Sequence, residues 1–357
     1  MNIRLLFCTF FITFILLTSG CVDNENDVSE SNGNESLLKI SEQDSSESVS
    51  NVTSDIDYRQ RMRNFVIGIS AYSKQKDPDF IVIPQNGQEL LTFGVGSDFL
   101  LANDYIAAID GVGREDLFFG YDDDNTPTSE QDTQRLMSLL DIAQDSGLKV
   151  LVTDYCRSLS YVDTSYRRNS EENYISFAAD SRDLDTIPDY PAEPFLVNSN
   201  NILDLGDARN FLYIINPEQF ESKEEFLEAL QQTDYDIILI DLFYDDETLT
   251  ADDIASLKTK TNGGSRLVVA YMSIGEAEDY RYYWNDSWSI GSPEWIEAEN
   301  PYWEGNYKVQ YWDPEWQSVI YGDEDAYLDM IQDSGFDGVY LDIIDAFEYF
   351  EEKEEQV

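Results

Sequence analysis

Short, nearly uninterrupted apolar runs recur along the chain, and most of them end in a polar or acidic residue. The runs that predict strands are residues 80–83, 104–117, 149–155, 211–215, 235–241, 266–274, 308–312 and 338–342. Continuous apolar runs, in place of strict alternation, are typical of parallel strands that are buried on both faces. Segments with helical spacing lie between most of them, for example residues 133–146 and 220–231, as crossover connections require.

Eight parallel strands with intervening helices over residues 58–357 predict an α/β fold, a (β/α)8 TIM barrel in a single domain. An open, doubly wound sheet with a second domain is the alternative. In a barrel the C-terminal ends of all strands converge on one face, where active sites lie.

Polar side chains follow the predicted strand ends, and a barrel would gather them on that face. The candidates are Asn86, Arg114, Glu115, Asp154, Tyr155, Asp241, Glu276, Trp312, Asp342 and Asp345. Clustered carboxylates repel one another, which raises the pKa of some and leaves others ionised. A general acid and a nucleophile or base need this division. For a single strand-end aspartate, capping of the next helix is the structural alternative.

The chain contains no histidine. Imidazole bases, His-activated nucleophiles and His metal sites are therefore excluded, and acid–base chemistry falls mainly to Asp and Glu. Carboxylates can also hold Mg²⁺ or Ca²⁺, but the acidic stretch at residues 121–126 lacks the spacing of a calcium loop. We therefore predict neither a metal nor another cofactor.

The stretch at residues 284–316 is rich in tryptophan. Such aromatics suit stacking against sugar rings, and packing within the core is the alternative for each of them. The balance of 22 basic and 72 acidic residues gives a formal net charge of −50, which argues against nucleic-acid binding. This acidity fits either a surface adapted to high salt or a cationic substrate.

The N-terminal region predicts export. Residues 5–17 form an apolar run that is too short to span a bilayer comfortably and resembles a signal sequence. It leads to LTSGC, which resembles a lipobox with Cys21 as the lipidated residue, so that residues 1–21 are the leader. An uncleaved anchor or a secreted form is the alternative. Residues 22–57 are polar and acidic and predict a disordered tether.

Several longer motifs resemble one enzyme family. They are SIGEAEDYR (273–281), YWDP (311–314), GFDGVYLD (335–342), PQNG (84–87) and DGVGREDLF (110–118). They resemble the endo-α-1,4-polygalactosaminidase-like glycoside hydrolases, family 114. The resemblance implies a TIM barrel and hydrolysis by an Asp and a Glu at strand ends. By motif position these are Asp342 and Glu115, with Asp241 and Glu276 as the next candidates.

The order of the motifs differs from that of the family. In relatives the segment resembling residues 211–350 comes first and the one resembling 58–155 follows, so this chain looks circularly permuted. A closed barrel tolerates the change because its first and last strands are neighbours. The expected consequence is that strand 339–342 pairs with strand 80–83.

These observations predict a lipid-anchored extracellular glycosidase that acts on an amino-sugar polysaccharide. A non-catalytic carbohydrate-binding lipoprotein on the same barrel is the alternative. The predicted partners are a polysaccharide and, through the lipid alone, a membrane; the oligomeric state is left open.

Overall fold

The computed structural model describes residues 56–94 and 99–356. Asp57–Val357 form one compact unit. The predicted leader, its lipobox cysteine Cys21 and the tether up to residue 55 lie outside the described residues. Within the described part, none of the helices is both long and apolar enough to cross a membrane.

The larger of the two parallel sheets brings both ends of this unit together. Its strand order is β1-β15-β11-β8-β7. The strands are β1 (Ile81–Pro84), β7 (Phe211–Tyr213), β8 (Ile237–Ile240), β11 (Leu267–Ser273) and β15 (Gly338–Asp342). Nearly every residue in them is buried, as the continuous apolar runs predict. The predicted pairing of the first strand with the last is confirmed, with Ile81 opposite Gly338 and Pro84 opposite Leu341.

The second parallel sheet has the order β4-β5-β6, with β4 at Gly111–Glu115, β5 at Lys149–Tyr155 and β6 at Ile175–Ala179. Single parallel bridges connect it to the first sheet at both edges. One joins Gln85, after β1, to Gly113 of β4; the other joins Ser176 of β6 to Asn210, before β7. The α/β fold with parallel strands is therefore confirmed, although the sequence pattern did not predict β6.

The predicted parallel strand at residues 308–312 is wrong. The segment contributes β14 (Asn306–Val309), which pairs antiparallel with β12 (Glu276–Glu278) and β13 (Ile296–Glu299). This side sheet follows β11 directly, so it begins at the C-terminal end of a parallel strand.

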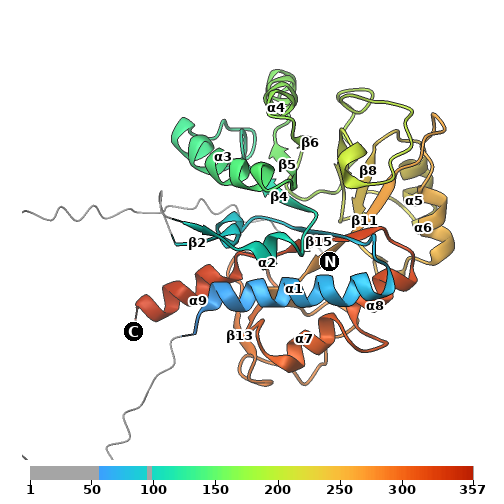
Figure 1. Cartoon of the computed structure of the whole chain (residues 1–357). Coiled ribbons are helices and arrows are strands. Elements are labelled where there is room, and N and C mark those ends of the chain that lie inside the picture. Colours follow the sequence, from blue (N-terminus) through green and yellow to red (C-terminus); the bar gives the residue numbers. More distant parts are fainter. Residues whose placement is uncertain (1–55, 95–98, 357) are drawn as a thin grey trace, which may run out of the picture. The chain divides into compact units, whose positions relative to one another are not determined.

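The helices lie mostly between successive parallel strands. They are α1 (Tyr58–Lys76), α2 (Asn103–Ile106), α3 (Glu130–Asp145), α4 (Leu159–Glu171), α5 (Lys223–Gln231), α6 (Ala251–Leu257), α7 (Pro314–Ile320), α8 (Tyr327–Asp333) and α9 (Ala346–Glu355). Helices α1 and α9 lie side by side (Figure 1). Arg59 of α1 binds both carboxylate oxygens of Glu351 in α9 at 2.8 and 2.9 Å.

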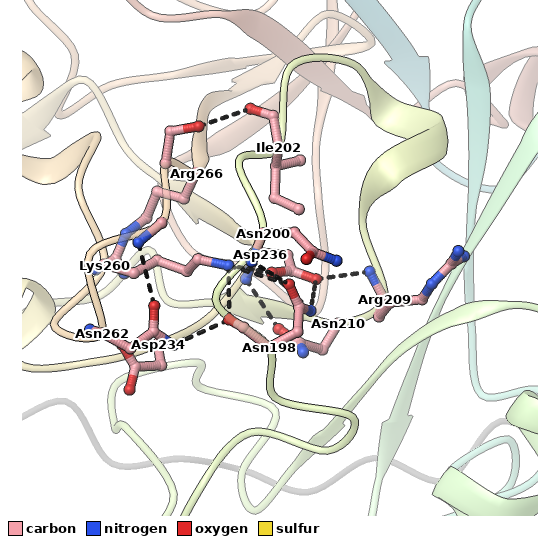
Figure 2. A network of polar contacts seen from close by, with 12 residues as sticks. Asn198, Asn200, Ile202, Arg209, Asn210, Asp234, Asp236, Lys260, Asn262 and Arg266 are labelled. Atoms are coloured by element: carbon pink, nitrogen blue, oxygen red, sulfur yellow. Dashed lines mark hydrogen bonds and ion pairs between the residues drawn. The ribbon is translucent and has the colours of Figure 1, made fainter.

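A buried ion pair ties the N-terminal ends of β7, β8 and β11 together (Figure 2). Lys260 and Asp236 lie 2.8 Å apart, and both side chains are fully buried. The second oxygen of Asp236 accepts hydrogen bonds from Asn198 and from the backbone N–H of Arg209, both at 2.9 Å. Because the partners of both charges are in place, this ion pair has a structural role.

We expect Lys260→Met to lower the free energy of unfolding by about 3–5 kcal/mol, because it leaves the Asp236 carboxylate buried without its counter-charge. Urea titration measures the change. Lys76→Met, which removes an exposed ion pair with Asp333, is the control and costs less than about 1 kcal/mol. Equal effects of the two changes would contradict this role.

Candidate functional site

The C-terminal ends of β4 and β15 place Glu115 and Asp342 on one side of the sheets. Side chains two apart in a strand point to the same face, so Glu115 shares its face with Gly113 and Asp342 shares its face with Tyr340. Gly113 and Tyr340 are packed against each other, since a Cβ atom on Gly113 would lie 2.0 Å from the Tyr340 hydroxyl oxygen. The structure thus brings together the two carboxyls that the sequence predicts as a pair.

Three donors surround the carboxylate of Glu115. Its Oε2 accepts hydrogen bonds from Gln85 Nε2 at 2.6 Å and from Asn86 Nδ2 at 2.9 Å. Its Oε1 accepts one from the hydroxyl of Tyr155, whose ring is covered by the guanidinium of Arg182. An ionised carboxylate accepts such bonds through both oxygens, so this shell orients Glu115 and suits its charged form.

The environment of Asp342, in contrast, favours the protonated form of its carboxyl. Burial, and then the nearby charge of Glu115, raise the pKa of Asp342 to about 8. The Tyr271 hydroxyl donates a hydrogen bond to its Oδ2 at 2.9 Å, which reduces the shift without cancelling it. Near neutral pH the carboxyl of Asp342 therefore keeps its proton.

A layer of tyrosines lies beneath this pair. It consists of Tyr213 on β7, Tyr271 on β11 and Tyr340 on β15, and burial raises the pKa of all three well above the usual value. The Tyr213 hydroxyl donates to Gln85 Oε1 at 3.2 Å, and its ring meets that of Tyr340 at 5.4 Å between centroids. The tyrosines thus support both the donor shell of Glu115 and the carboxyl of Asp342. Sequence reasoning missed them because each one sits in an apolar run.

Asp241, predicted at the end of β8, is bound by a residue that the sequence analysis did not select. Arg281 binds both of its oxygens, at 2.9 and 2.7 Å, and also reaches Glu278 Oε2 at 2.5 Å. Glu278 lies toward Asp342, since the charges of both contribute to the raised pKa of Tyr271. Two carboxylates thus share one guanidinium, which leaves this side of the site with a net negative charge.

Glu276 belongs to β12 in the side sheet and is almost fully buried. Its Oε1 lies 3.1 Å from Lys308 Nζ and accepts a hydrogen bond from Asn300 at 2.9 Å. Its Oε2 has no partner among the residues that the structure describes. Glu276 therefore holds Lys308, whose charge opposes, without cancelling, the rise that burial causes in the pKa of Asp345.

Asn86, Arg114 and Asp345 line a polar cavity of about 190 Å³ beside Glu115. Burial raises the pKa of Asp345 to about 6, against the opposing effect of Arg114. These three residues therefore lie where the sequence analysis places them, at the strand ends around Glu115.

Asp154 does not face this site. It follows Thr153 and precedes Tyr155 on β5, so its side chain points to the opposite face from that of Tyr155. It is fully buried, and it accepts hydrogen bonds from the backbone N–H groups of Phe118 and Phe119 and from the side chains of Ser165 and Asn169. The geometry gives it a structural role in place of the predicted contact with substrate.

Trp312 also lies elsewhere. Its ring packs 4.7 Å from that of Phe350 and 5.2 Å from that of Tyr58, between α9 and α1. Trp295 and Trp316 pack on each other in the same way, 5.2 Å apart. Packing, the alternative that the sequence left open, therefore accounts for these three tryptophans.

No group of three or more His, Cys, Asp or Glu side chains is placed to hold a metal ion in the described part of the chain.

We expect Asp154→Ala to lower the free energy of unfolding by about 3 kcal/mol or more, because it leaves several buried donors without an acceptor. Thermal unfolding measures the loss. The matched control is Asp252→Ala on exposed helix surface, which stays within about 0.5 kcal/mol. A stable Asp154→Ala protein with altered substrate affinity would restore the sequence prediction.

Comparisons with known proteins agree with the motifs. Residues 208–356 match the model of glycoside-hydrolase family GH114. This segment holds β7, β8, β11 and β15, and hence Asp342 and Asp241, whereas Glu115 lies outside it.

Three uncharacterized proteins are similar over shorter segments. One from Methanocaldococcus jannaschii is 37% identical over 158 residues, which is 43% of each chain. One from Thermotoga maritima is 52% identical over 82 residues (23% of this chain, 24% of the relative), and one from Deinococcus radiodurans is 40% identical over 122 residues (34% and 37%). The matches thus span less than half of each relative. Over residues 208–356 the chain is therefore similar to glycoside hydrolase family 114, which supports the resemblance of its motifs.

Proposed function

We propose that this protein is a glycoside hydrolase whose catalytic pair is Asp342 and Glu115. The family match implies glycosidase chemistry and a polysaccharide substrate. The observation that carries the assignment is that two carboxyls from distant parts of the sequence meet at the ends of β15 and β4. One of them has its pKa raised to about 8 by burial and by the other. Glycosidases need such a pair, one member protonated and one ionised.

In the proposed mechanism the protonated carboxyl donates its proton to the glycosidic oxygen as the bond from that oxygen to the anomeric carbon breaks. The ionised carboxylate attacks the anomeric carbon or removes a proton from the attacking water. Where the carboxylate attacks, water then displaces it from the anomeric carbon and frees it. In both cases water supplies the new hydroxyl, and its other proton restores the acid, directly or through the second carboxylate. In the unliganded protein the proton rests mainly on Asp342, and the three donors around Glu115 suit the ionised partner.

The proposed substrate is a polymer that contains free amino sugars, of the polygalactosamine type. The family resemblance of the motifs suggests it. The charge around the site supports it, since Asp241 and Glu278 share the single guanidinium of Arg281. An ammonium group on the sugar would be attracted to this side of the cleft.

We further propose that the two parallel sheets close into a (β/α)8 barrel and that the chain is circularly permuted. The two sheets supply five and three strands, and single bridges link them at both edges. The parallel pairing of β1 with β15 supports closure of the barrel, which a permuted order requires. The family match is confined to the C-terminal segment, as a changed order would produce.

Export with a lipid anchor at Cys21 is also a proposal. It is supported by the apolar run at residues 5–17 and the LTSGC sequence that follows it. A cell-surface position would give the enzyme access to an extracellular polysaccharide.

We expect Asp342→Asn and Glu115→Gln each to reduce kcat/KM by about 10²–10⁴-fold, which is the usual contribution of a positioned acid or base to the rate. Release of reducing ends from α-1,4-linked polygalactosamine measures the rate. Asp323→Asn, an exposed charge change, is the control and leaves the rate unchanged. If the wild type binds the polymer but does not cleave it, the protein is a carbohydrate-binding lipoprotein and the enzyme proposal fails.

The pH dependence follows from the raised pKa of Asp342. A carboxyl with a raised pKa keeps its proton below that value and loses it above, so the pair has its catalytic proton up to about pH 8. We expect kcat/KM to fall about tenfold for each pH unit above this point. A profile of kcat/KM against pH measures it. A decline that begins near pH 5 would show that the pair is not coupled as described.

A further inference from the structure

Arg182, which follows β6, donates hydrogen bonds to three residues of the segment that follows β4. Its Nη1 and Nη2 groups donate to both carboxylate oxygens of Asp116, at 3.3 and 2.8 Å. Its Nε donates to Asp124 Oδ1 at 2.9 Å, and Nη2 also donates to the backbone oxygen of Gly120 at 3.0 Å. The planar fork of a guanidinium makes such paired bonds, which a lysine ammonium does not reproduce. Arg182 therefore fastens the segment after β4 to the segment after β6.

The face of the same guanidinium lies on the ring of Tyr155. Arg182 Cζ is 3.9 Å from the ring centroid, and the tyrosine is almost fully buried. The hydroxyl of this tyrosine donates to Glu115 Oε1. The same segment also holds the backbone of Tyr155, since its N–H donates to the Phe119 oxygen at 3.1 Å and its carbonyl accepts from Asn125 at 2.8 Å. Arg182 thus holds one of the donors to the catalytic carboxylate.

A second connection runs through the backbone next to Glu115. Asp116 follows Glu115 directly and has a φ of 61°, in the left-handed region that non-glycine residues rarely adopt. Such a conformation persists where the surroundings impose it. Here the Asp116 N–H donates to the Thr153 oxygen at 2.9 Å, and Arg182 holds the side chain. Gly120 makes room for that side chain, since a Cβ atom there would lie 2.2 Å from Asp116 Oδ1.

We propose that Arg182 is a positioning residue for Glu115, and that it fixes the direction of this carboxylate through Tyr155 and through the backbone at Asp116. The proposal rests on the glycosidase function above and goes beyond it, because it adds a residue outside the catalytic pair on which the rate depends. A small displacement of a reacting group lowers the rate strongly. Loss of Arg182 should therefore lower kcat and leave KM nearly unchanged.

The kinetic test combines Arg182→Gln with Tyr155→Phe, which removes only the hydroxyl that reaches Glu115. We expect Arg182→Gln to lower kcat on polygalactosamine about tenfold or more and to change KM by less than about twofold. Arg182→Lys, which keeps the charge but not the paired bonds or the stacking, should fail to restore kcat. In the Tyr155→Phe background, Arg182→Gln should cost less than in the wild type, because the two residues act along one connection.

A spectroscopic test requires no hydrolysis. In protein with carbon-13-labelled glutamate, the Cδ resonance of Glu115 is assigned by its absence in Glu115→Gln, and it reports the surroundings of this carboxylate. We expect Arg182→Gln and Tyr155→Phe each to shift or broaden this resonance, and the double variant to change it by less than the sum. Arg182→Lys should shift it too, which separates loss of position from loss of charge.

Arg167→Gln is the matched control, because Arg167 forms an exposed ion pair with Glu171 on α4. It should leave both kcat and the Glu115 resonance as in the wild type. A Glu115 resonance that stays unchanged in Arg182→Gln and Arg182→Lys overturns the proposal, as do effects of Arg182→Gln and Tyr155→Phe that simply add.

If Arg182→Gln does not fold, Arg182→Lys decides the proposal by the same two measurements. If the wild type does not hydrolyse the polymer, the proposed function fails, and the Glu115 resonance alone decides whether Arg182 positions this carboxylate.

Discussion

The approach of Glu115 and Asp342 is the constraint on which the site depends. Two carboxyls this close repel each other, and burial makes the second negative charge more costly. The fold keeps the two carboxyls close despite this repulsion, because β1 lies between β15 and β4 and fixes the positions from which the two side chains emerge. The resulting pKa of about 8 for Asp342 is the property that a carboxylic acid needs to act as a proton donor near neutral pH.

The surrounding structure supplies the rigidity that this pair requires. The tyrosine layer supports it from below, and the ends of the compact unit are fastened where β1 pairs with β15 and α1 meets α9. At the opposite end of the strands the buried Lys260–Asp236 pair has all of its hydrogen bonds satisfied. Other charged groups lie near the C-terminal ends of the strands, around Arg281 and in the polar cavity.

The sequence predicts the strand-end carboxyls well because an apolar run followed by an acid is a local pattern. It misses β6, whose Ile175–Ala179 run is weakened by serine and alanine, and it assigns residues 308–312 to the parallel set because apolar runs look alike in both kinds of sheet. It also cannot tell Asp154 from Glu115, because the face that a side chain takes depends on register. Arg281 is missed for another reason: its role depends on contacts with Asp241 and Glu278, which chain neighbours alone do not show.

Carbon-13 NMR titration of labelled Asp and Glu side chains tests the central claim most directly, because it follows the protons of the pair without any assumption about substrate. We expect the carboxyl of Asp342 to stay protonated through pH 7, with an apparent pKa of about 8. Its pKa should decrease when Glu115→Gln removes the neighbouring charge. Titration of Asp342 near the ordinary value of about 4 would contradict its raised pKa and, with it, the assignment of this pair.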